Sequence, residues 1–422
     1  MSTKVDVLIR YAFYAFIIAI PFETASLEFA SILGSLPKVM GIAFLGAALL
    51  QPRICFSPPP GAFWCFAGYI FAYVILGMTQ KSTYAGPMLE RLLTLIQMLL
   101  LMWISYNLFK YPEICKGALL AFVASCMIVS VLQISGVATV KIAQGRTSVF
   151  ADNANTVGAN LSLGLIALLG ITHGRMMVDK GVALLAWTWF AVMGIAIVMT
   201  GSRGALLGLL SGLALLIIKE GRRGTKLKVG LVAVLAISFL VWASYTNEAM
   251  RTRWENTLYK GSLAKREEII PQAWAMFLEK PVLGWGPVAH YVELGYRFDK
   301  PSKDTHNLYL WVLTETGLLG SIPFFAGLWL SLKAAWRARS GREGSLPMAM
   351  LVCLLTVNMS ATWHNRKMFW LTMAYVLASA WSLRQVSQHL PVQFSDPLAS
   401  QGSGTFPSSS HPAEGVSGTT SA

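Results

Sequence analysis

The stretch at residues 114–133, ICKGALLAFVASCMIVSVLQ, holds 20 residues with a single charged side chain, Lys116. A helix needs about 20 mostly apolar residues to cross the hydrocarbon core of a bilayer. The whole chain agrees with this pattern, because 55% of its 422 residues are hydrophobic and 13% are charged, whereas soluble domains carry about 25% charged residues. Lipid is therefore expected to be the main solvent around the protein.

Similar apolar stretches on both sides of this one predict an all-α polytopic membrane protein with about twelve transmembrane helices. The first stretch follows Lys4 and Arg10 and looks like a signal peptide, but no convincing cleavage site follows, so we expect a retained span. The expected spans lie near residues 7–22, 36–50, 61–78, 88–108, 114–133, 156–173, 182–199, 204–218, 229–245, 307–332, 346–361 and 367–384.

These spans organise the chain into one integral membrane domain, residues 1–384, and a tail, residues 385–422. One large loop, residues 246–305, interrupts the membrane domain and is expected to contain helices of its own. The tail is rich in Ser, Gly, Pro and Thr and almost uncharged, a composition typical of disorder.

Basic residues give the expected orientation, since Lys and Arg are retained on the cytoplasmic side. With the N-terminus inside, the inner loops carry sixteen basic residues and the short outer loops eight. Both termini are then cytoplasmic, and loop 246–305 faces the periplasm. The net charge of +14 fits contact with anionic membrane lipids, so no nucleic-acid partner is expected.

Metal and disulfide chemistry has no signature in the sequence. The five cysteines fall inside or beside apolar stretches, and none lies in the large loop. His-x-x-x-His pairs and acidic clusters with metal-ligand spacing are absent from the sequence. We therefore expect neither a metal site nor a cofactor.

Two arginines break the charge bias on the outer side. Arg203 lies in TGSRGAL at 200–206, between Gly201 and Gly204, where a cation at a membrane edge is a functional candidate and the glycines permit a tight turn. Arg146 lies in GRTSVFADNAN at 145–155, beside amide side chains such as Asn155. The alternatives are that Arg203 snorkels or binds a carbonyl, and that Arg146 is an ordinary solvated loop residue.

The large loop contains a helical pattern at 262–279. Ile269, Ile270, Ala273, Trp274 and Phe277 recur at helical spacing, and Pro281 stops the helix before a GWGP turn. The apolar face would lie on the bundle or among headgroups. Arg266, in the first turn, would then point to the membrane edge, or alternatively pair with Glu267 in water.

His306 is the most suggestive titratable group. Asp304 or Thr305 is expected to cap a helix that starts there, and the positive end of the helix dipole would lower the pKa of His306. A neutral histidine can act as a general base, although a histidine at an interface can simply bond a carbonyl. His290 and His364 show no comparable setting in the sequence.

Arginine forks match phosphate oxygens, so arginines and one neutral histidine at a membrane edge suit a lipid-linked diphosphate. Once its charge is neutralised, the diphosphate is a good leaving group for transfer to a sugar hydroxyl. Aromatic side chains that could stack on sugars lie in or beside the loop, at Trp254, Tyr259, Trp285 and Tyr291.

Motifs in the same region resemble the O-antigen ligase and polymerase superfamily. They are TGSRGAL at 200–206, KR at 265–266 followed by AW at 273–274, EKPVLGWG at 279–286, HNLYL at 306–310, and ETG at 315–317 with Gly320. The resemblance covers residues 140–325 best, and the chain length and single dominant loop are similar to the ligase branch.

The resemblance implies a GT-C-like fold and metal-independent inverting transfer of O-antigen from undecaprenyl diphosphate to a terminal sugar of lipid A-core. It implies that Arg203 and Arg266 bind the diphosphate and that His306 is the base. Arg146 matches less securely, since Ala154 stands where the family often has Pro. The candidates for glycan contact or for support of the site are Asn155, Trp285, Asn307 and Glu315.

Other functions stay open. A second large Arg-rich outer loop would favour an O-antigen polymerase, but loop 134–155 is short. A protein O-oligosaccharyltransferase would usually add a C-terminal periplasmic region. A lipid-linked glycan flippase would show repeat symmetry and charges near the midplane, whereas here the charges gather at one face.

Overall fold

The computed structural model describes residues 5–23, 35–142, 145–173, 180–217, 234 and 237–389. Apart from one short hairpin, the regular structure of these residues is helical. The helical bundle contains α1 (Val7–Ala19), α2 (Leu36–Leu50), α3 (Pro52–Cys55), α4 (Gly61–Met78), α5 (Ala85–Phe109), α6 (Pro112–Ser135), α7 (Ala154–His173), α8 (Lys180–Met199), α9 (Arg203–Ile217), α14 (Leu308–Ala338), α15 (Leu346–Val357) and α16 (Lys367–His389). The remaining elements are β1 (Thr139–Ile142), β2 (Arg146–Val149), α11 (Glu248–Lys260), α12 (Arg266–Glu279), α13 (Ala289–Tyr296) and the 3-10 turns η1 (Ile20–Phe22), η3 (Ser82–Tyr84) and η5 (Trp363–Asn365).

Length and hydropathy identify a helical membrane protein. Five helical stretches of the described chain are long and apolar enough to span a bilayer: Gly61–Met78, Ser82–Phe109, Pro112–Ser135, Ala154–Thr172 and Leu308–Ala338. Shorter apolar helices occupy Val7–Phe22, Leu36–Leu50, Leu185–Met199, Arg203–Leu216, Ile237–Thr246 and Leu346–Val357. Most of the expected spans thus coincide with apolar helices, while the count of twelve stays a prediction.

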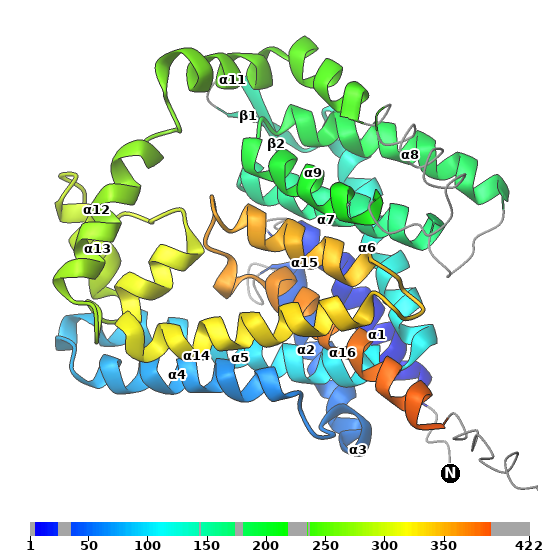
Figure 1. Cartoon of the computed structure of the whole chain (residues 1–422), viewed down its shortest axis with the longest axis horizontal. Coiled ribbons are helices and arrows are strands. Elements are labelled where there is room, and N and C mark those ends of the chain that lie inside the picture. Colours follow the sequence, from blue (N-terminus) through cyan, green and yellow to red (C-terminus); the bar gives the residue numbers. More distant parts are fainter. Residues whose placement is uncertain are drawn as a thin grey trace, which may run out of the picture.

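Local sequence explains where these helices end and how closely they pack. Pro112 starts α6, and Gly136 ends it with a left-handed φ of 79°, as expected for proline in a first turn and glycine just after a last one. α14 lies along α4, α16 along α5, and α15 along α9 (Figure 1). In α9, a Cβ on Gly212 would lie 2.9 Å from the carbonyl oxygen of Ala349, so a small residue is needed where α9 and α15 meet.

The structure corrects several expected boundaries. The all-α expectation misses the hairpin, in which β1 and β2 pair antiparallel with Ile142 opposite Arg146. The helix expected at 262–279 begins only at Arg266, because Lys265 has a left-handed φ of 67°. α16 continues to His389, past the expected tail boundary at 385, and residues 390–422 lie outside the described residues.

The packing face of α12 also differs from the expected one. Its buried residues are Ile269, Ala273, Met276 and Phe277, whereas Trp274 is 48% exposed. The buried face packs on α13 and on the first part of α14, and Figure 1 shows α12 and α13 grouped beside that end of α14. The large loop is therefore a helical unit docked on the bundle.

Candidate functional site

His306 lies at the junction between the large loop and α14. The structure corrects the expected cap, because α14 begins at Leu308 and Asn307 is its N-cap, with its side-chain oxygen accepting from the backbone N–H of Tyr309 and Leu310. His306 precedes the cap and has a left-handed φ of 49°. This conformation is uncommon for a non-glycine residue and costs backbone energy. Asn307 is thus a capping residue and lies next to the candidate base.

Asp304 is the direct neighbour of His306. Its Oδ1 accepts a hydrogen bond from the backbone N–H of His306 at 2.6 Å and lies 3.9 Å from the imidazole Nδ1. The imidazole itself is 46% exposed, so a ligand can reach it. A carboxylate beside a histidine is the arrangement that orients an imidazole and stabilises its protonated form.

The pKa of His306 is lowered, as expected, but for a different reason. Desolvation by the surrounding protein lowers it, the negative charge of Asp304 opposes this, and the positive charges of Arg266 and Lys303 lower it further. His306 precedes the first turn of α14, so the lowering comes from desolvation and neighbouring charges and not from the helix dipole. The neutral imidazole that a general base requires is favoured by burial and neighbouring cations.

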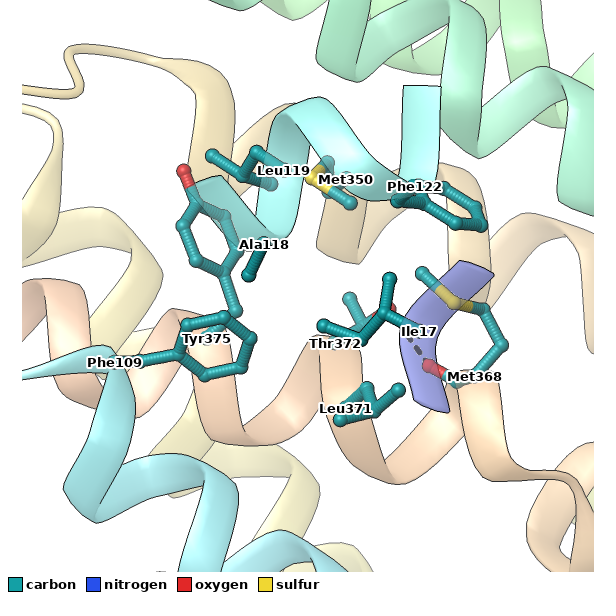
Figure 2. Close-up of a pocket in the computed structure, with 10 residues that line it drawn as sticks. All are labelled: Ile17, Phe109, Ala118, Leu119, Phe122, Met350, Met368, Leu371, Thr372 and Tyr375. Carbon is teal, nitrogen blue, oxygen red and sulfur yellow. Dashed lines mark hydrogen bonds between the residues drawn. The ribbon is translucent and has the colours of Figure 1, made fainter. Parts of the chain in front are cut away.

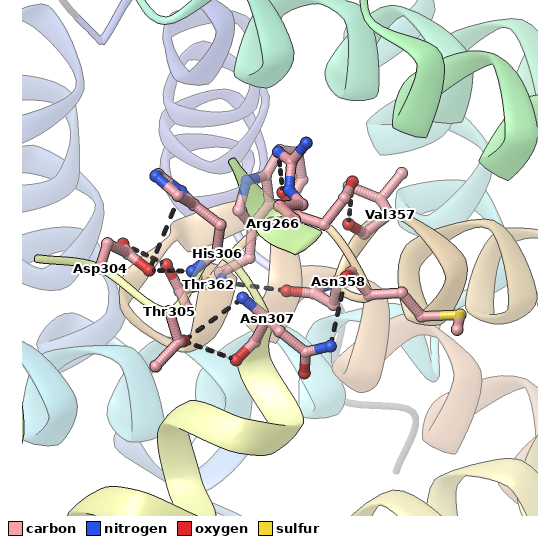
Figure 3. Close-up of polar contacts among 11 residues, drawn as sticks. Arg266, Asp304, Thr305, His306, Asn307, Val357, Asn358 and Thr362 are labelled. Carbon is pink, nitrogen blue, oxygen red and sulfur yellow. Dashed lines mark hydrogen bonds and ion pairs between the residues drawn. The ribbon is translucent and has the colours of Figure 1, made fainter. Parts of the chain in front are cut away.

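The segment after α15 holds this junction together (Figure 3). Ser360 accepts from Nη2 of Arg266 at 3.0 Å through its backbone oxygen, and the backbone oxygen of Met359 accepts from Nδ2 of Asn307 at 3.3 Å. The hydroxyl of Thr362 donates to Asp304 Oδ2 at 2.7 Å. Residues 358–362 therefore join the loop helix α12 to the base and its carboxylate.

Arg266 begins α12 and points toward this segment. Its Nη1 also donates to the backbone oxygen of Leu263 at 3.3 Å, and its Nε is buried without a hydrogen-bond partner. The expected alternative, pairing with Glu267, is not observed, because Glu267 Oε2 accepts from the backbone N–H of Leu263. Burial and the charge of Arg203 lower the pKa of Arg266, against the effect of Asp304 and Glu267.

Arg203 starts α9 directly after a tight turn in which Gly201 has a φ of 62°. Its Nη1 donates to the backbone oxygens of Arg253 and Ser262, both at 3.1 Å. Carbonyl binding was the alternative expected for this residue, and the structure shows it. Both bonds use Nη1, one of the three guanidinium nitrogens, and they connect the start of α9 to the large loop.

Arg146 is built into the hairpin and is not a freely solvated loop residue. Its Nε donates to the backbone oxygen of Thr200 at 2.8 Å, and its Nη2 donates to Oδ1 of Asn155 at 2.9 Å. A Cβ on Gly201 would lie 2.9 Å from Cγ of Arg146, so this glycine makes room for the arginine. Asn155 therefore orients Arg146, and Arg146 contacts the turn that precedes Arg203.

Arg253, in α11, is a fourth cation of this site that sequence reasoning missed. Its residue is 8% exposed, and its backbone oxygen accepts from Arg203. Burial first, and then the positive charges of Arg146, Arg203 and Arg266, lower the pKa of Arg253 to about 10. In the sequence Arg253 is one arginine of a polar segment, and nothing in that pattern indicates that its side chain is buried.

These four residues, Arg146, Arg203, Arg253 and Arg266, form what we call the arginine cluster. Among the described residues, the ion pairs of basic side chains involve Arg251, Arg297, Arg366 and Lys367 and none of the four. The hydrogen-bond partners of the Arg146, Arg203 and Arg266 side chains are carbonyl and amide oxygens. The carboxylates of Asp304 and Glu267 offset only part of the positive charge at Arg266. Four neighbouring guanidinium groups without an ion pair among the described residues therefore favour an anionic ligand.

The aromatic residues expected to stack on sugars have mixed settings. Trp285 donates from Nε1 to the backbone oxygen of Met276 at 2.8 Å, and Nζ of Lys280 lies 3.7 Å from its ring centroid. Tyr291 stacks on Trp311 at 6.1 Å, and Trp254 packs against the core. Tyr259 is 85% exposed. Only Tyr259 of these four offers a largely open ring.

Glu315 is buried at 1% exposure, as is His290, and the two side chains approach to 3.9 Å between Oε1 and Nδ1. Glu315 therefore cannot contact a bound glycan, which corrects one of the two roles expected for it. His290 also has a defined setting that its sequence did not reveal. Burial, followed by the charge of Arg91, lowers the pKa of His290 well below its ordinary value.

A separate apolar cavity lies inside the bundle, between α1, α5, α6, α15 and α16 (Figure 2). Its lining consists of Ile17, Phe109, Ala118, Leu119, Phe122, Met350, Met368, Leu371, Thr372 and Tyr375, so it contains no member of the candidate site. Among the described residues, no group of three or more His, Cys, Asp or Glu side chains could hold a metal ion.

Comparison with known proteins finds a family match that covers most of the site. No curated protein matches the chain. The family model described as O-antigen ligase matches residues 188–325, a range that contains Arg203, Arg253, Arg266 and His306. Over these residues, about a third of the chain, the resemblance to the O-antigen ligase and polymerase family is confirmed.

Proposed function

We propose that the protein is an O-antigen ligase, a metal-independent inverting glycosyltransferase that moves O-antigen from undecaprenyl diphosphate to a terminal sugar of lipid A-core. The observation that carries this proposal is the convergence of the arginine cluster with the Asp304–His306 pair at the junction of loop and bundle. The family match supports the reaction class, and the apolar helices supply the lipid setting for a polyprenyl donor.

In this mechanism the arginine cluster binds the diphosphate of the donor. Guanidinium groups offer paired N–H donors that suit phosphate oxygens. Their charge also stabilises the negative charge that develops on the departing diphosphate, which lowers the barrier to breaking the bond between the anomeric carbon and the phosphate oxygen. Binding replaces carbonyl partners of Arg203 and Arg266 with stronger, charged ones.

His306 then accepts the proton of the attacking hydroxyl. The acceptor oxygen forms a bond to the anomeric carbon on the face opposite the diphosphate, the proton passes to the imidazole, and undecaprenyl diphosphate leaves. Asp304 stabilises the imidazolium that forms, because its carboxylate lies 3.9 Å from Nδ1. Asn155 orients Arg146, and Asn307 caps the helix that follows the base.

We further propose that the site faces the periplasm of a bacterial inner membrane, with both termini in the cytoplasm. The distribution of basic residues supports this orientation. The connections expected on the outer side are also joined to one another: the hairpin bonds the turn after α8, and α12 bonds the segment after α15.

An O-antigen polymerase would use the same site with a growing glycan as acceptor, and the family match includes it. The outer connection between α6 and α7 favours the ligase, because it forms a hairpin of two four-residue strands and not a large Arg-rich loop.

Transfer by the purified protein tests the proposal. The reaction contains polyprenyl-diphosphate glycan, lipid A-core and a chelator, and products are resolved by gel and mass spectrometry. The proposal expects glycosylated lipid A-core from the wild type and none from His306→Ala. Elongated lipid-linked glycan without lipid A-core product would identify a polymerase, and full activity of His306→Ala would contradict the mechanism.

A further inference from the structure

The large loop and α14 are joined through their backbones at a break in α14. Gly317, within this helix, has a φ of 55° and a ψ of −156°, so the helical hydrogen-bond pattern is interrupted there. Unpaired backbone groups inside a membrane helix cost several kcal/mol each. Residues 281–286 bind them: Trp285 N–H donates to Thr314 O (2.8 Å), Gly286 N–H to Glu315 O (2.9 Å), Leu318 N–H to Pro281 O (2.8 Å) and Leu319 N–H to Val282 O (3.1 Å).

Two glycines make this junction possible. A Cβ on Gly317 would lie 2.4 Å from the carbonyl oxygen of Val282, and one on Gly284 would lie 2.6 Å from the backbone nitrogen of Gly317. Both glycines also have a positive φ, 55° and 68°, which side-chain-bearing residues rarely adopt. The motif EKPVLGWG and the motif ETG are therefore two halves of one structure.

Glu315 stands beside this break and links it to a neighbouring helix. Its Oε2 accepts a hydrogen bond of 2.7 Å from the hydroxyl of Tyr69, in α4. Its Oε1 has no hydrogen-bond partner and faces Nδ1 of His290 at 3.9 Å. Burying a carboxylate costs free energy unless it is hydrogen-bonded, so the burial of Glu315 indicates a structural or functional role.

His290 fastens the same turn from the other side. Its Nδ1 lies 3.2 Å from the carbonyl oxygen of Gly286, and since a carbonyl only accepts, Nδ1 carries the hydrogen. The N–H of Gly286 is thus bound by the backbone carbonyl of Glu315, and the carbonyl of Gly286 by the side chain of His290. Arg91, in α5, adds a third support, with its guanidinium carbon 4.2 Å from the ring centroid of Tyr291 and 5.1 Å from that of Trp311.

Residues 308–316, the part of α14 before the break, are consequently fixed by α4, α5 and the loop together. This segment begins directly after Asn307 and His306, and the break separates it from the rest of α14. Its direction therefore sets the direction in which His306 projects. A misplacement of about 1 Å at a reacting group can reduce the rate roughly 100-fold.

We propose that Glu315 is a positioning residue for the reaction proposed above: by binding Tyr69 and facing His290, it holds residues 308–316 on the 281–286 turn and places His306 opposite the arginine cluster. It acts through His306 and touches no substrate, because it is 1% exposed.

Kinetics of matched variants test the role. Glu315→Ala is expected to lower kcat about 10- to 100-fold with little change in the KM of the donor, since the arginine cluster is intact. Glu315→Gln should retain most of the wild-type kcat, because its amide oxygen still accepts from Tyr69, and Tyr69→Phe should resemble Glu315→Ala. Glu90→Gln, an exposed carboxylate of α5, is the control and should behave as wild type.

Two kinetic results would overturn the proposal. Wild-type kcat in Glu315→Ala would show that the contact with Tyr69 is dispensable. A Gln variant as slow as the Ala variant would show that the carboxylate charge, and not the hydrogen bond, is what the reaction needs.

Hydrogen–deuterium exchange of the detergent-solubilised protein decides the same question without activity. Glu315→Ala should accelerate exchange in peptides covering residues 304–312, while Glu315→Gln and Glu90→Gln should not. Unchanged exchange in Glu315→Ala would refute the positioning role. If the wild type transfers no glycan, the proposed function fails, yet this exchange measurement still gives its own result.

Discussion

Two groups of cations lie at the same end of the bundle and differ in one respect. Arg366, directly before α16, and Lys367, its first residue, both form ion pairs with Glu23, which follows η1 after α1. In the arginine cluster, the side chains of Arg146, Arg203 and Arg266 bind carbonyl and amide oxygens. No member of the cluster forms an ion pair with a carboxylate among the described residues. The first group is neutralised within the protein and ties two helices together, whereas the second keeps its charge available for an anionic ligand.

Replacing the base should give the largest effect. His306→Ala removes the proton acceptor while leaving the arginine cluster intact, so transfer should fall about 10²- to 10⁴-fold with donor binding retained. The measurement is the initial rate of lipid A-core glycosylation alongside binding of labelled donor. Equal losses in rate and donor binding would instead assign His306 to donor recognition.

Replacing a member of the arginine cluster should come next. A hydrogen bond to a charged group contributes about 1.5–3 kcal/mol, so Arg266→Gln or Arg253→Gln should weaken donor binding roughly 10- to 100-fold. Arg266→Lys should bind the donor almost as weakly as Arg266→Gln, because lysine lacks the planar guanidinium that pairs with phosphate oxygens. Donor KM over a titration of the lipid-linked glycan measures this, and Arg251→Gln, an exposed arginine of α11 paired with Glu255, is the control. A donor KM unchanged in both variants would remove the cluster from donor binding.

The pH dependence should shift in opposite directions in two variants. Asp304 raises the pKa of His306 and Arg266 lowers it, and the base works when it is unprotonated. Asp304→Asn should therefore move the acidic limb of the pH–rate profile to lower pH, and Arg266→Gln should move it to higher pH. Rates measured across the acidic range at saturating substrates check this, and shifts in the same direction would show that the limb does not report His306.

The smallest effect is expected at the neutralised group. Arg366→Gln leaves Glu23 paired with Lys367, so stability should change by about 1 kcal/mol or less and donor KM should stay at the wild-type value. Thermal unfolding in detergent and the transfer assay measure the two quantities. A large rise in donor KM here would remove the distinction between the two groups.

Much of the fold could be predicted because lipid demands long apolar helices. The stretch 114–133 lies inside α6, and most of the other expected spans coincide with apolar helices. The hairpin at 139–149 was missed because its strands are only four residues each, and α11 was missed because its polar sequence carries no apolar stripe.

The site was predictable where a residue type is unusual in its surroundings. Arg203 and His306 stand out because charged or titratable groups at membrane edges are rare. Arg253 does not stand out, since only tertiary packing shows that it is buried against Arg203. The cap of α14 was assigned to Asp304 or Thr305 when Asn307 holds it, because all three types can cap and the sequence does not choose among them. The setting of His290 depends on its contact with Glu315, 25 positions further along the chain, which the sequence alone does not show.

Equilibrium binding of radiolabelled undecaprenyl diphosphate in detergent tests the central claim most directly, because it needs no acceptor and no turnover. We predict that His306→Ala and Arg366→Gln bind it as the wild type does, that Arg266→Gln binds it roughly 10- to 100-fold more weakly, and that the double variant Arg253→Gln/Arg266→Gln binds it more weakly still. Undiminished binding by the double variant would contradict the assignment of the arginine cluster to the diphosphate.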